Sequence, residues 1–183
     1  MQKIINKIKS NLKFFTAIVI AILIMLSFFI YYNKKIQNLQ ISLSEKYYEA
    51  TTLINKKKYK DGTIILENII AKQNKLYSPL SLFLIIEKDL VTDENKVLDL
   101  FDKIISIKKM EKENLNLIKI KKALYISNSN NEIELLNLLN PIINSESIWK
   151  KEAVTILGDY FFNKGEKIKA NNYYKLLKLK KIN

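Results

Sequence analysis

The feature that most constrains this chain is an uncharged, mostly apolar run from Phe14 to Tyr32 (FFTAIVIAILIMLSFFIYY). At about 1.5 Å of rise per residue, a helix of this length spans about 28 Å, close to the ~30 Å hydrocarbon core of a bilayer. A helix that is apolar on every face would otherwise need a larger core than 183 residues can build. Tyr31 and Tyr32 lie where an aromatic belt meets the headgroups. The sequence therefore predicts a transmembrane anchor at residues 14–32.

A cleaved signal peptide is the alternative interpretation of this run. Secretory apolar regions are usually about 7–15 residues long and end at a site with small residues. Here the run is longer and leads into YYNKKIQNLQ, where no small-residue pair fits. The chain has no cysteine, so lipid attachment to a cysteine after cleavage is excluded. We therefore expect an uncleaved anchor.

The lysines around the span predict its orientation. Four precede it within the head formed by residues 1–13, while Lys34, Lys35 and the more distant Lys46 follow it. The N-terminal amine adds one more positive group before the span. The positive-inside rule then predicts a cytoplasmic N-terminus and a single pass through the inner (plasma) membrane. Residues 33–40 form a juxtamembrane segment, and residues 41–183 form a periplasmic or extracytoplasmic domain.

Composition excludes most catalytic chemistry. Histidine and cysteine are absent, so Ser-His and Cys-His nucleophile pairs and the common zinc sites cannot be built. Glu87, Asp89, Asp93 and Glu94 lie together, but at a predicted helix boundary where acids serve as caps. Neither a glycine-rich phosphate loop nor metal-ligand spacing occurs. The sequence predicts no enzyme, and no cofactor or metal.

The net charge of +13 suggests an anionic partner at first sight. All 31 basic residues are lysine, however, and arginine is the better residue for bidentate phosphate contacts. Many of these lysines flank the span or lie in residues 164–183. This basic end could contact anionic lipid or an acidic partner, or it could be a solvated helix face. We therefore expect no nucleic-acid partner.

From residue 41 onward, apolar residues recur at three- and four-residue steps, which predicts helices almost throughout. Two prolines and three glycines are too few for an all-β fold. Ser78-Pro79 and Asn140-Pro141 indicate helix boundaries. The predicted helices are 41–55, 60–75, 79–90, 94–108, 111–127, 132–143, 147–163 and 166–180.

The last two helices resemble the tetratricopeptide (TPR) pattern, in which small residues let paired helices approach and large ones fill the gap between them. The matching residues are Leu157, Gly158, Phe161, Gly165, Ala170 and Tyr174. In the first hairpin they are Ala50, Leu53, Gly62 and Leu66. Val97 and Ile133 stand where the middle units would place the small residue of their second helix. The fold class predicted is all-α: one transmembrane helix followed by an α-solenoid of about four TPR-like hairpins. An ordinary helical bundle is the alternative.

With its single span and compact repeat domain, the chain resembles the YfgM-like ancillary subunits of the bacterial Sec translocon. The resemblance is carried by EKYYEATTLINKKKYKDGTIILENII (45–70) and SIWKKEAVTILGDYFFNKGEKIKANNYYKLL (147–177). It implies an inner-membrane protein that exposes its repeats to the periplasm. The implied partners are translocon subunits, periplasmic chaperones and unfolded clients, and no catalytic residue is implied.

A TPR stack exposes a concave groove made mainly by the first helix of each pair. The usual TPR geometry predicts partner-binding residues in the first and last units: Tyr47, Thr51, Ile54, Thr155, Asp159 and Phe162, with Ser44, Asn55, Glu152 and Asn163 beside them. Tyr47 and Phe162 would be the aromatic anchors, unless they pack against neighbouring repeats instead.

Three functions remain open at this stage. The first is a membrane-tethered scaffold beside the Sec machinery that assists handover of secreted chains. The second is an envelope scaffold in cell division or outer-membrane assembly, with no translocon role. The third is a lysine-dependent binder of nucleic acid or anionic lipid. Ala17 and Ala21 also form a small-xxx-small pair that would let the span form a homo-oligomer.

Overall fold

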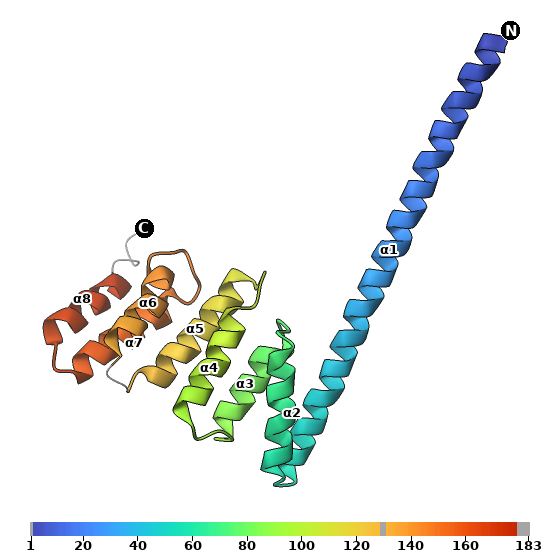
Figure 1. The fold of residues 1–183 in the computed structure, drawn as a ribbon. Helices are drawn as coiled ribbons and strands as arrows, with labels where there is room; N and C mark the ends of the chain where they lie inside the picture. The colour runs from blue at the N-terminus through green and yellow to red at the C-terminus, as the bar shows by residue number, and fades with distance from the viewer. Residues whose placement is uncertain (1, 129–130, 179–183) are drawn as a thin grey trace. The chain divides into compact units, whose positions relative to one another are not determined.

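The computed structural model describes the backbone of residues 2–128 and 131–178 and the side chains of residues 14, 16–128 and 131–177. All regular secondary structure in these ranges is α-helical, which confirms the predicted all-α class (Figure 1). The helices are α1 (Gln2–Asn55), α2 (Tyr59–Ala71), α3 (Tyr77–Glu87), α4 (Glu94–Ile105), α5 (Lys112–Ile126), α6 (Glu132–Ile143), α7 (Lys150–Asn163) and α8 (Lys167–Lys178).

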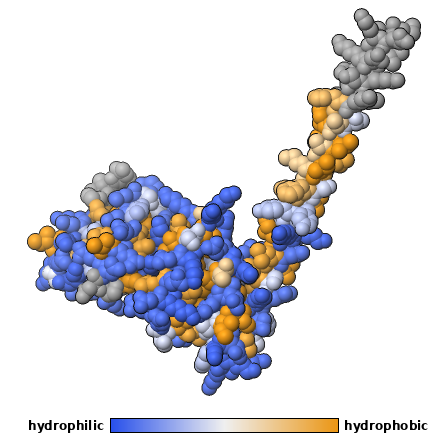
Figure 2. Space-filling view, in the orientation of Figure 1, coloured by the Kyte–Doolittle hydropathy of each residue, from blue (hydrophilic) through white to orange (hydrophobic). Residues whose placement is uncertain are grey.

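Helix α1 is one continuous helix and includes the predicted juxtamembrane segment 33–40. No glycine or proline occurs in residues 1–55, so nothing in the local sequence ends the helix. From Thr16 onward it is long and apolar enough to cross a membrane, with a mean hydropathy of 2.1 in its most apolar stretch. Hydrophobic side chains dominate the surface of this stretch in Figure 2.

The chain divides into two compact units, residues 1–46 and 47–183. In the second unit each helix from α2 to α8 packs against the next one in sequence. Helix α2 also contacts α4, and α5 also contacts α7. Contacts are therefore made mainly between neighbours in sequence, as the order of the helices in Figure 1 illustrates.

Helices α4 and α6 begin at polar side-chain caps. The Asp93 carboxylate accepts hydrogen bonds from the backbone N–H groups of Asn95 and Lys96, at 3.0 and 3.3 Å. The Asn131 side chain caps α6 by accepting from the N–H of Glu134 at 3.2 Å. Each cap satisfies backbone donors that have no partner within the helix.

Helices α1, α2, α3 and α7 are each followed, two residues later, by a residue with a left-handed backbone, and a fifth such residue lies in the α4–α5 connection. Gly165 has φ +79°, but Lys57, Gln73, Asp89 and Lys109 take up the same region with φ between 49° and 61°. The chain is poor in glycine, so lysine, glutamine and aspartate fill a position that glycine normally occupies. The signal that best marks helix ends in a sequence is therefore missing at four of these five turns.

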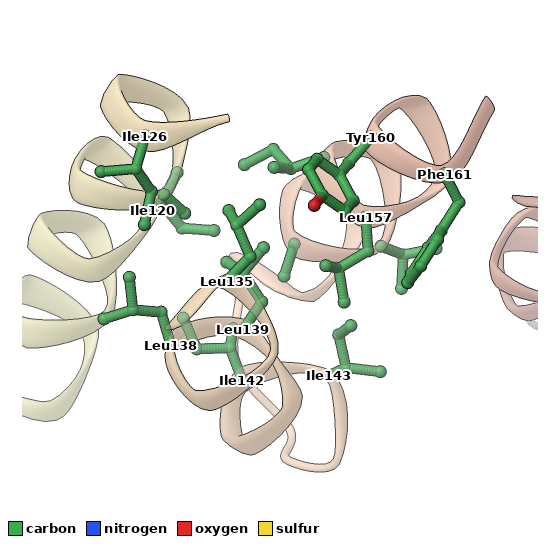
Figure 3. Close-up of a cluster of buried hydrophobic side chains, with 14 of the residues drawn as sticks. Ile120, Ile126, Leu135, Leu138, Leu139, Ile142, Ile143, Leu157, Tyr160 and Phe161 are labelled. Atoms are coloured by element: carbon green, nitrogen blue, oxygen red, sulfur yellow. The ribbon is translucent and has the colours of Figure 1, made fainter. Parts of the chain in front are cut away.

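The main hydrophobic core lies where α5, α6 and α7 meet (Figure 3). Leu135 and Leu139 of α6 and Leu157 of α7 are fully buried. Ile120 and Ile126 of α5 close the cluster from the other side of α6. Helix α6 therefore buries side chains against both of its neighbours.

Neither proline marks a helix boundary as predicted. Pro79 lies inside the first turn of α3, where backbone N–H groups have no partner within the helix. Helix α6 matches the predicted range 132–143 and runs through Pro141, because a proline this close to the end of a helix removes only one of its last backbone hydrogen bonds.

Helix α7 begins at Lys150, not at Ser147. The Ser147 hydroxyl donates to the Glu113 carboxylate at 2.6 Å, and the Trp149 indole N–H donates to the Glu113 carbonyl at 3.0 Å. These bonds to α5 hold the segment as a turn.

Candidate partner-binding groove

The small residues predicted in the first hairpin lie at a close helix approach. Ala50 of α1 is fully buried, and Gly62 of α2 lies against it. A Cβ atom at Gly62 would lie 3.1 Å from the Ala50 carbonyl oxygen and 2.7 Å from Ile54 Cγ1. Only glycine fits there without a shift of its neighbours.

The last hairpin packs in a similar way. A Cβ at Gly158 would overlap the ring of Tyr174, and Leu157, Phe161 and Ala170 are buried. The Phe161 ring stacks on Tyr173, with ring centroids 5.6 Å apart. Residues predicted as structural repeat positions thus line the contact between α7 and α8.

The middle repeat prediction fails at Ile133, whose side chain is 74% exposed. Leu135, Leu138 and Leu139 fill the interior from α6 instead. Val97, the other middle position, is buried as expected. A regular 35–37-residue spacing therefore does not identify the buried face of α6, since a shift of two residues rotates a helix by more than half a turn.

The predicted groove residues of α1 have different surroundings. Ile54 is only 5% exposed and packs on Gly62, so it belongs to the interior and not to an open groove. The Thr51 hydroxyl donates to the Tyr48 carbonyl at 2.7 Å. Tyr47 is half-buried, with its ring 6.1 Å from that of Tyr77. Burial and the negative charge of Glu87 both raise the pKa of the Tyr47 phenol.

In α7 the predicted groove residues are more accessible. Phe162 is 55% exposed. Asp159 is exposed and accepts a hydrogen bond from the Tyr174 hydroxyl at 2.6 Å, which raises the pKa of Tyr174 to about 12. The Thr155 hydroxyl is used within its own helix, where it donates to the Lys151 carbonyl at 3.0 Å. Ser44, Asn55, Glu152 and Asn163, predicted beside the groove, are all exposed.

An apolar depression on the domain lies between α3 and α5 and was not singled out by the sequence. It has a volume of about 460 Å³ and is lined by Phe83, Ile86, Glu87, Lys121, Leu124 and Tyr125. We call it the α3–α5 groove. Its volume is within the range of about 300–1,000 Å³ common for ligand sites.

Helical spacing places these residues on the two facing sides. Phe83, Ile86 and Glu87 are three and four residues apart on α3, and Lys121, Leu124 and Tyr125 repeat that spacing on α5. The Lys121 ammonium lies 6.0 Å from the centre of the Phe83 ring. The Tyr125 ring packs against Phe101 of α4, with centroids 6.0 Å apart. Both aromatic rings of the groove are therefore held by a neighbouring side chain.

The exposure of these side chains leaves apolar area open to a partner. Leu124 is 49% exposed, and Phe83 and Ile86 are half-buried. Leu80, one turn before Phe83 or Leu84, is 37% exposed. Helix α3 reads YSPLSLFLIIE and is apolar around most of its circumference. This excess was the available sequence signal: a helix with more apolar residues than one buried face needs leaves the rest on the surface.

Comparison of the chain with protein-family models, curated proteins and solved structures gave no match. Function is therefore inferred from the apolar part of helix α1 and from the α3–α5 groove.

Proposed function

We propose that this protein is a membrane-anchored helical scaffold that binds a segment of a partner polypeptide in the α3–α5 groove. The observation that carries the proposal is the exposed apolar lining of that groove, in which Leu124 is open to solvent and shares the lining with two aromatic side chains, Phe83 and Tyr125. Partner segments bind where rigid apolar and aromatic side chains offer concave surface, because little side-chain entropy is lost there.

The domain belongs, in this proposal, to the TPR-like solenoids. The close approach of Ala50 and Gly62 and the contact of Gly158 with Tyr174 support it, since small residues at these places are what such hairpins require. The pairing of α2 to α8 with their neighbours in sequence is compatible with a solenoid. Helices α3 and α5 are then the first helices of consecutive hairpins, which face the concave side.

The partner we propose is the secretion machinery. The resemblance of residues 45–70 and 147–177 to YfgM-like ancillary Sec subunits supports a role in handing secreted polypeptides to extracytoplasmic chaperones. The excess of lysine before the span supports a cytoplasmic N-terminus, which would place the domain on the extracytoplasmic side, where those chaperones are. Both points are sequence arguments, so the experiment must identify the partners directly.

The test is co-purification from detergent-solubilised membranes with the full chain carrying a C-terminal tag. The parent chain is compared with Leu124→Asp, which places a charge on the floor of the groove. Ile168→Asp is the matched control, because Ile168 lies on α8 and is 81% exposed. We expect translocon subunits and periplasmic chaperones to be recovered with the parent and the control, and to be lost with Leu124→Asp.

Two other outcomes discriminate among the alternatives. Recovery of division or outer-membrane assembly proteins without any translocon subunit would replace the Sec role by the envelope-scaffold role. Equal recovery of all partners with Leu124→Asp and with the parent would remove the groove as the binding site. Thermal unfolding followed by circular dichroism confirms that each variant is folded.

A further inference from the structure

One acidic residue lines the α3–α5 groove, and three more follow it closely in sequence. Glu87 lines the groove as the last residue of α3, and Asp89, Asp93 and Glu94 follow in the turn and at the start of α4. We call residues 87–94 the acidic end. Four carboxylates therefore occur within eight residues in a chain whose net charge is +13. The start of α4 accounts for Asp93 and Glu94, whereas Glu87 and Asp89 lie at the C-terminal end of α3, where the helix dipole disfavours negative charge.

Little of this charge is neutralised internally. Within the described part of the chain, the only ion pair of these four acids joins Glu87 to its neighbour Lys88, at 2.9 Å. Both of those side chains are largely exposed, so the pair is weak. The Asp93 carboxylate caps α4 and makes no ion pair among the described residues.

The acidic end acts on the groove itself. After burial, the causes that raise the pKa of the Tyr125 phenol are the charges of Glu94, Asp89 and Asp93. Since Tyr125 lines the groove, its phenol reports a negative potential at that position. Lys121 is the one basic residue of the lining, and its ammonium lies over the Phe83 ring. No ion pair of Lys121 is present among the described residues.

Building on the function proposed above, we infer that the groove selects a basic, apolar polypeptide segment. Apolar side chains of that segment fill the space between Phe83 and Leu124. Its lysine or arginine side chains then meet the carboxylates of the acidic end. An acidic segment is disfavoured by repulsion between like charges, so the acidic end determines specificity. The apolar side chains that line the groove supply most of the affinity.

The effect of this charge complementarity on binding affinity can be stated as a fold-change. An exposed ion pair of ordinary strength changes affinity by about two- to threefold, so two or three such pairs amount to about tenfold. The effect weakens as salt screens the charges, because the Debye length falls from about 10 Å at 0.1 M to about 3 Å at 1 M. Apolar contacts do not weaken in this way.

The experiment uses the full chain in nanodiscs of uncharged phosphatidylcholine, with empty nanodiscs as the background. Fluorescent synthetic peptides share one leucine-rich core and carry lysine, serine or glutamate at the same flanking positions. Fluorescence anisotropy gives their dissociation constants at low and high salt. We expect the lysine peptide to bind about tenfold more tightly than the glutamate peptide at low salt, and the difference to shrink at high salt.

Matched variants separate charge from shape. Glu87→Gln with Asp89→Asn removes two negative charges, and asparagine tolerates the left-handed backbone at residue 89, where φ is 49°. Glu49→Gln with Glu146→Gln removes the same charge at exposed positions of α1 and of the α6–α7 turn. The first pair should weaken the preference for the lysine peptide, because only Asp93 and Glu94 remain, and the second pair should leave the preference unchanged.

The outcomes distinguish this inference from the proposed function. Equal binding of lysine and glutamate peptides overturns the inference about charge. So does a preference for the lysine peptide that is as strong with Glu87→Gln and Asp89→Asn as with the parent. So does the absence of any peptide binding above empty nanodiscs. In each of those cases the proposed function is decided separately by the co-purification with Leu124→Asp. If all peptides bind Leu124→Asp as they bind the parent, the groove itself is not the site and both proposals fail.

Discussion

At the scale of single residues, the left-handed helix ends are the least expected feature of this domain. Lysine, glutamine and aspartate occupy positions that favour glycine, at a strain of about 1–2 kcal/mol each. The cost is spread over exposed turns, where the long side chains extend into solvent. Substitution by glycine at these positions can therefore increase the free energy of unfolding.

Lys57→Gly should stabilise the protein by about 0.5–1 kcal/mol. Relief of the strain at φ 61° outweighs the ~0.5–1 kcal/mol that glycine costs through the entropy of the unfolded chain. Urea unfolding of the solubilised chain measures the difference. Lys56→Gly is the control and should destabilise, since Lys56 has no positive φ to relieve. A loss of stability with Lys57→Gly contradicts the strain argument.

Tyr174 should couple stability to alkaline pH. Its hydrogen bond to the ionised Asp159 raises its pKa to about 12 in the folded state, above the ordinary value of 10.0. The stabilising contribution is therefore complete below pH 10 and is lost as the pH rises towards 12. Thermal unfolding across this range, compared with Tyr174→Phe, measures the effect. Parallel pH profiles for parent and variant would show that the bond contributes nothing.

At the scale of helices, two kinds of contact decide how hairpins pair. One is steric: the missing side chain at Gly62 lets α2 approach α1 at Ala50. The other is polar: Lys122 of α5, with its side chain 6% exposed, lies 2.7 Å from both Asp102 of α4 and Glu134 of α6. The glycine contact is specific to α1 and the lysine contact to α4 and α6, whereas leucine and isoleucine contacts are exchangeable.

Gly62→Val should destabilise the domain by about 2 kcal/mol. The first added carbon would overlap Ile54 and press on the Ala50 carbonyl oxygen, and overpacking of this kind costs about 1–3 kcal/mol. Asn68→Val on the exposed side of α2 is the control and should change stability by less than about 0.5 kcal/mol. Urea unfolding compares the two. A neutral Gly62→Val would mean that α1 and α2 can separate freely at this point.

Lys122→Ala should cost about 2–3 kcal/mol, and Lys122→Met about half as much. Methionine retains the buried methylene packing, while Asp102 is exposed enough to remain hydrated after the ammonium is lost. Burial by itself lowers the pKa of Lys122, but the hydrogen bonds and charges of Asp102 and Glu134 outweigh it and raise the pKa. The contribution of the pair should therefore persist below pH 10.5 and fall only above it. Urea unfolding at pH 7 and at strongly alkaline pH measures both effects, and equal stability of all three chains would refute them.

At the scale of the whole molecule, the apolar helix and the helical domain are stabilised in different ways. The anchor is defined by composition, and its side chains from Thr16 to Tyr32 are exposed, as lipid contact requires. The domain has its own core around α6. Which side of the membrane holds that domain decides which partners it can meet, so topology is the first property to establish.

Cysteine labelling should place the domain outside the cytoplasm. The chain has no native cysteine, so single substitutions report without background. In spheroplasts, a membrane-impermeant maleimide should label Asn163→Cys, because residue 163 is exposed at the end of α7. Ser10→Cys, in the basic head, should be labelled only after the membrane is permeabilised. The opposite pattern would invert the topology and exclude periplasmic partners.

Much of this architecture is determined by the sequence alone. A run of apolar residues at 14–32 that exceeds any buried face indicates the anchor, and three- and four-residue spacing indicates the later helices to within a few positions. These are local properties, set by bilayer thickness and helix geometry. Ala50 and Gly62 were also recognisable, because close packing requires small residues.

Only the tertiary structure decided which apolar residues are covered. Ile54 and Ile133 look alike in sequence, yet one is 5% and the other 74% exposed. The groove joins Phe83 to Tyr125, which belong to helices separated by a whole intervening helix. Periodicity shows that a helix has an apolar face, but the neighbour that covers that face is fixed by long-range packing. A surface left uncovered, such as the α3–α5 groove, becomes visible only when all neighbours are in place.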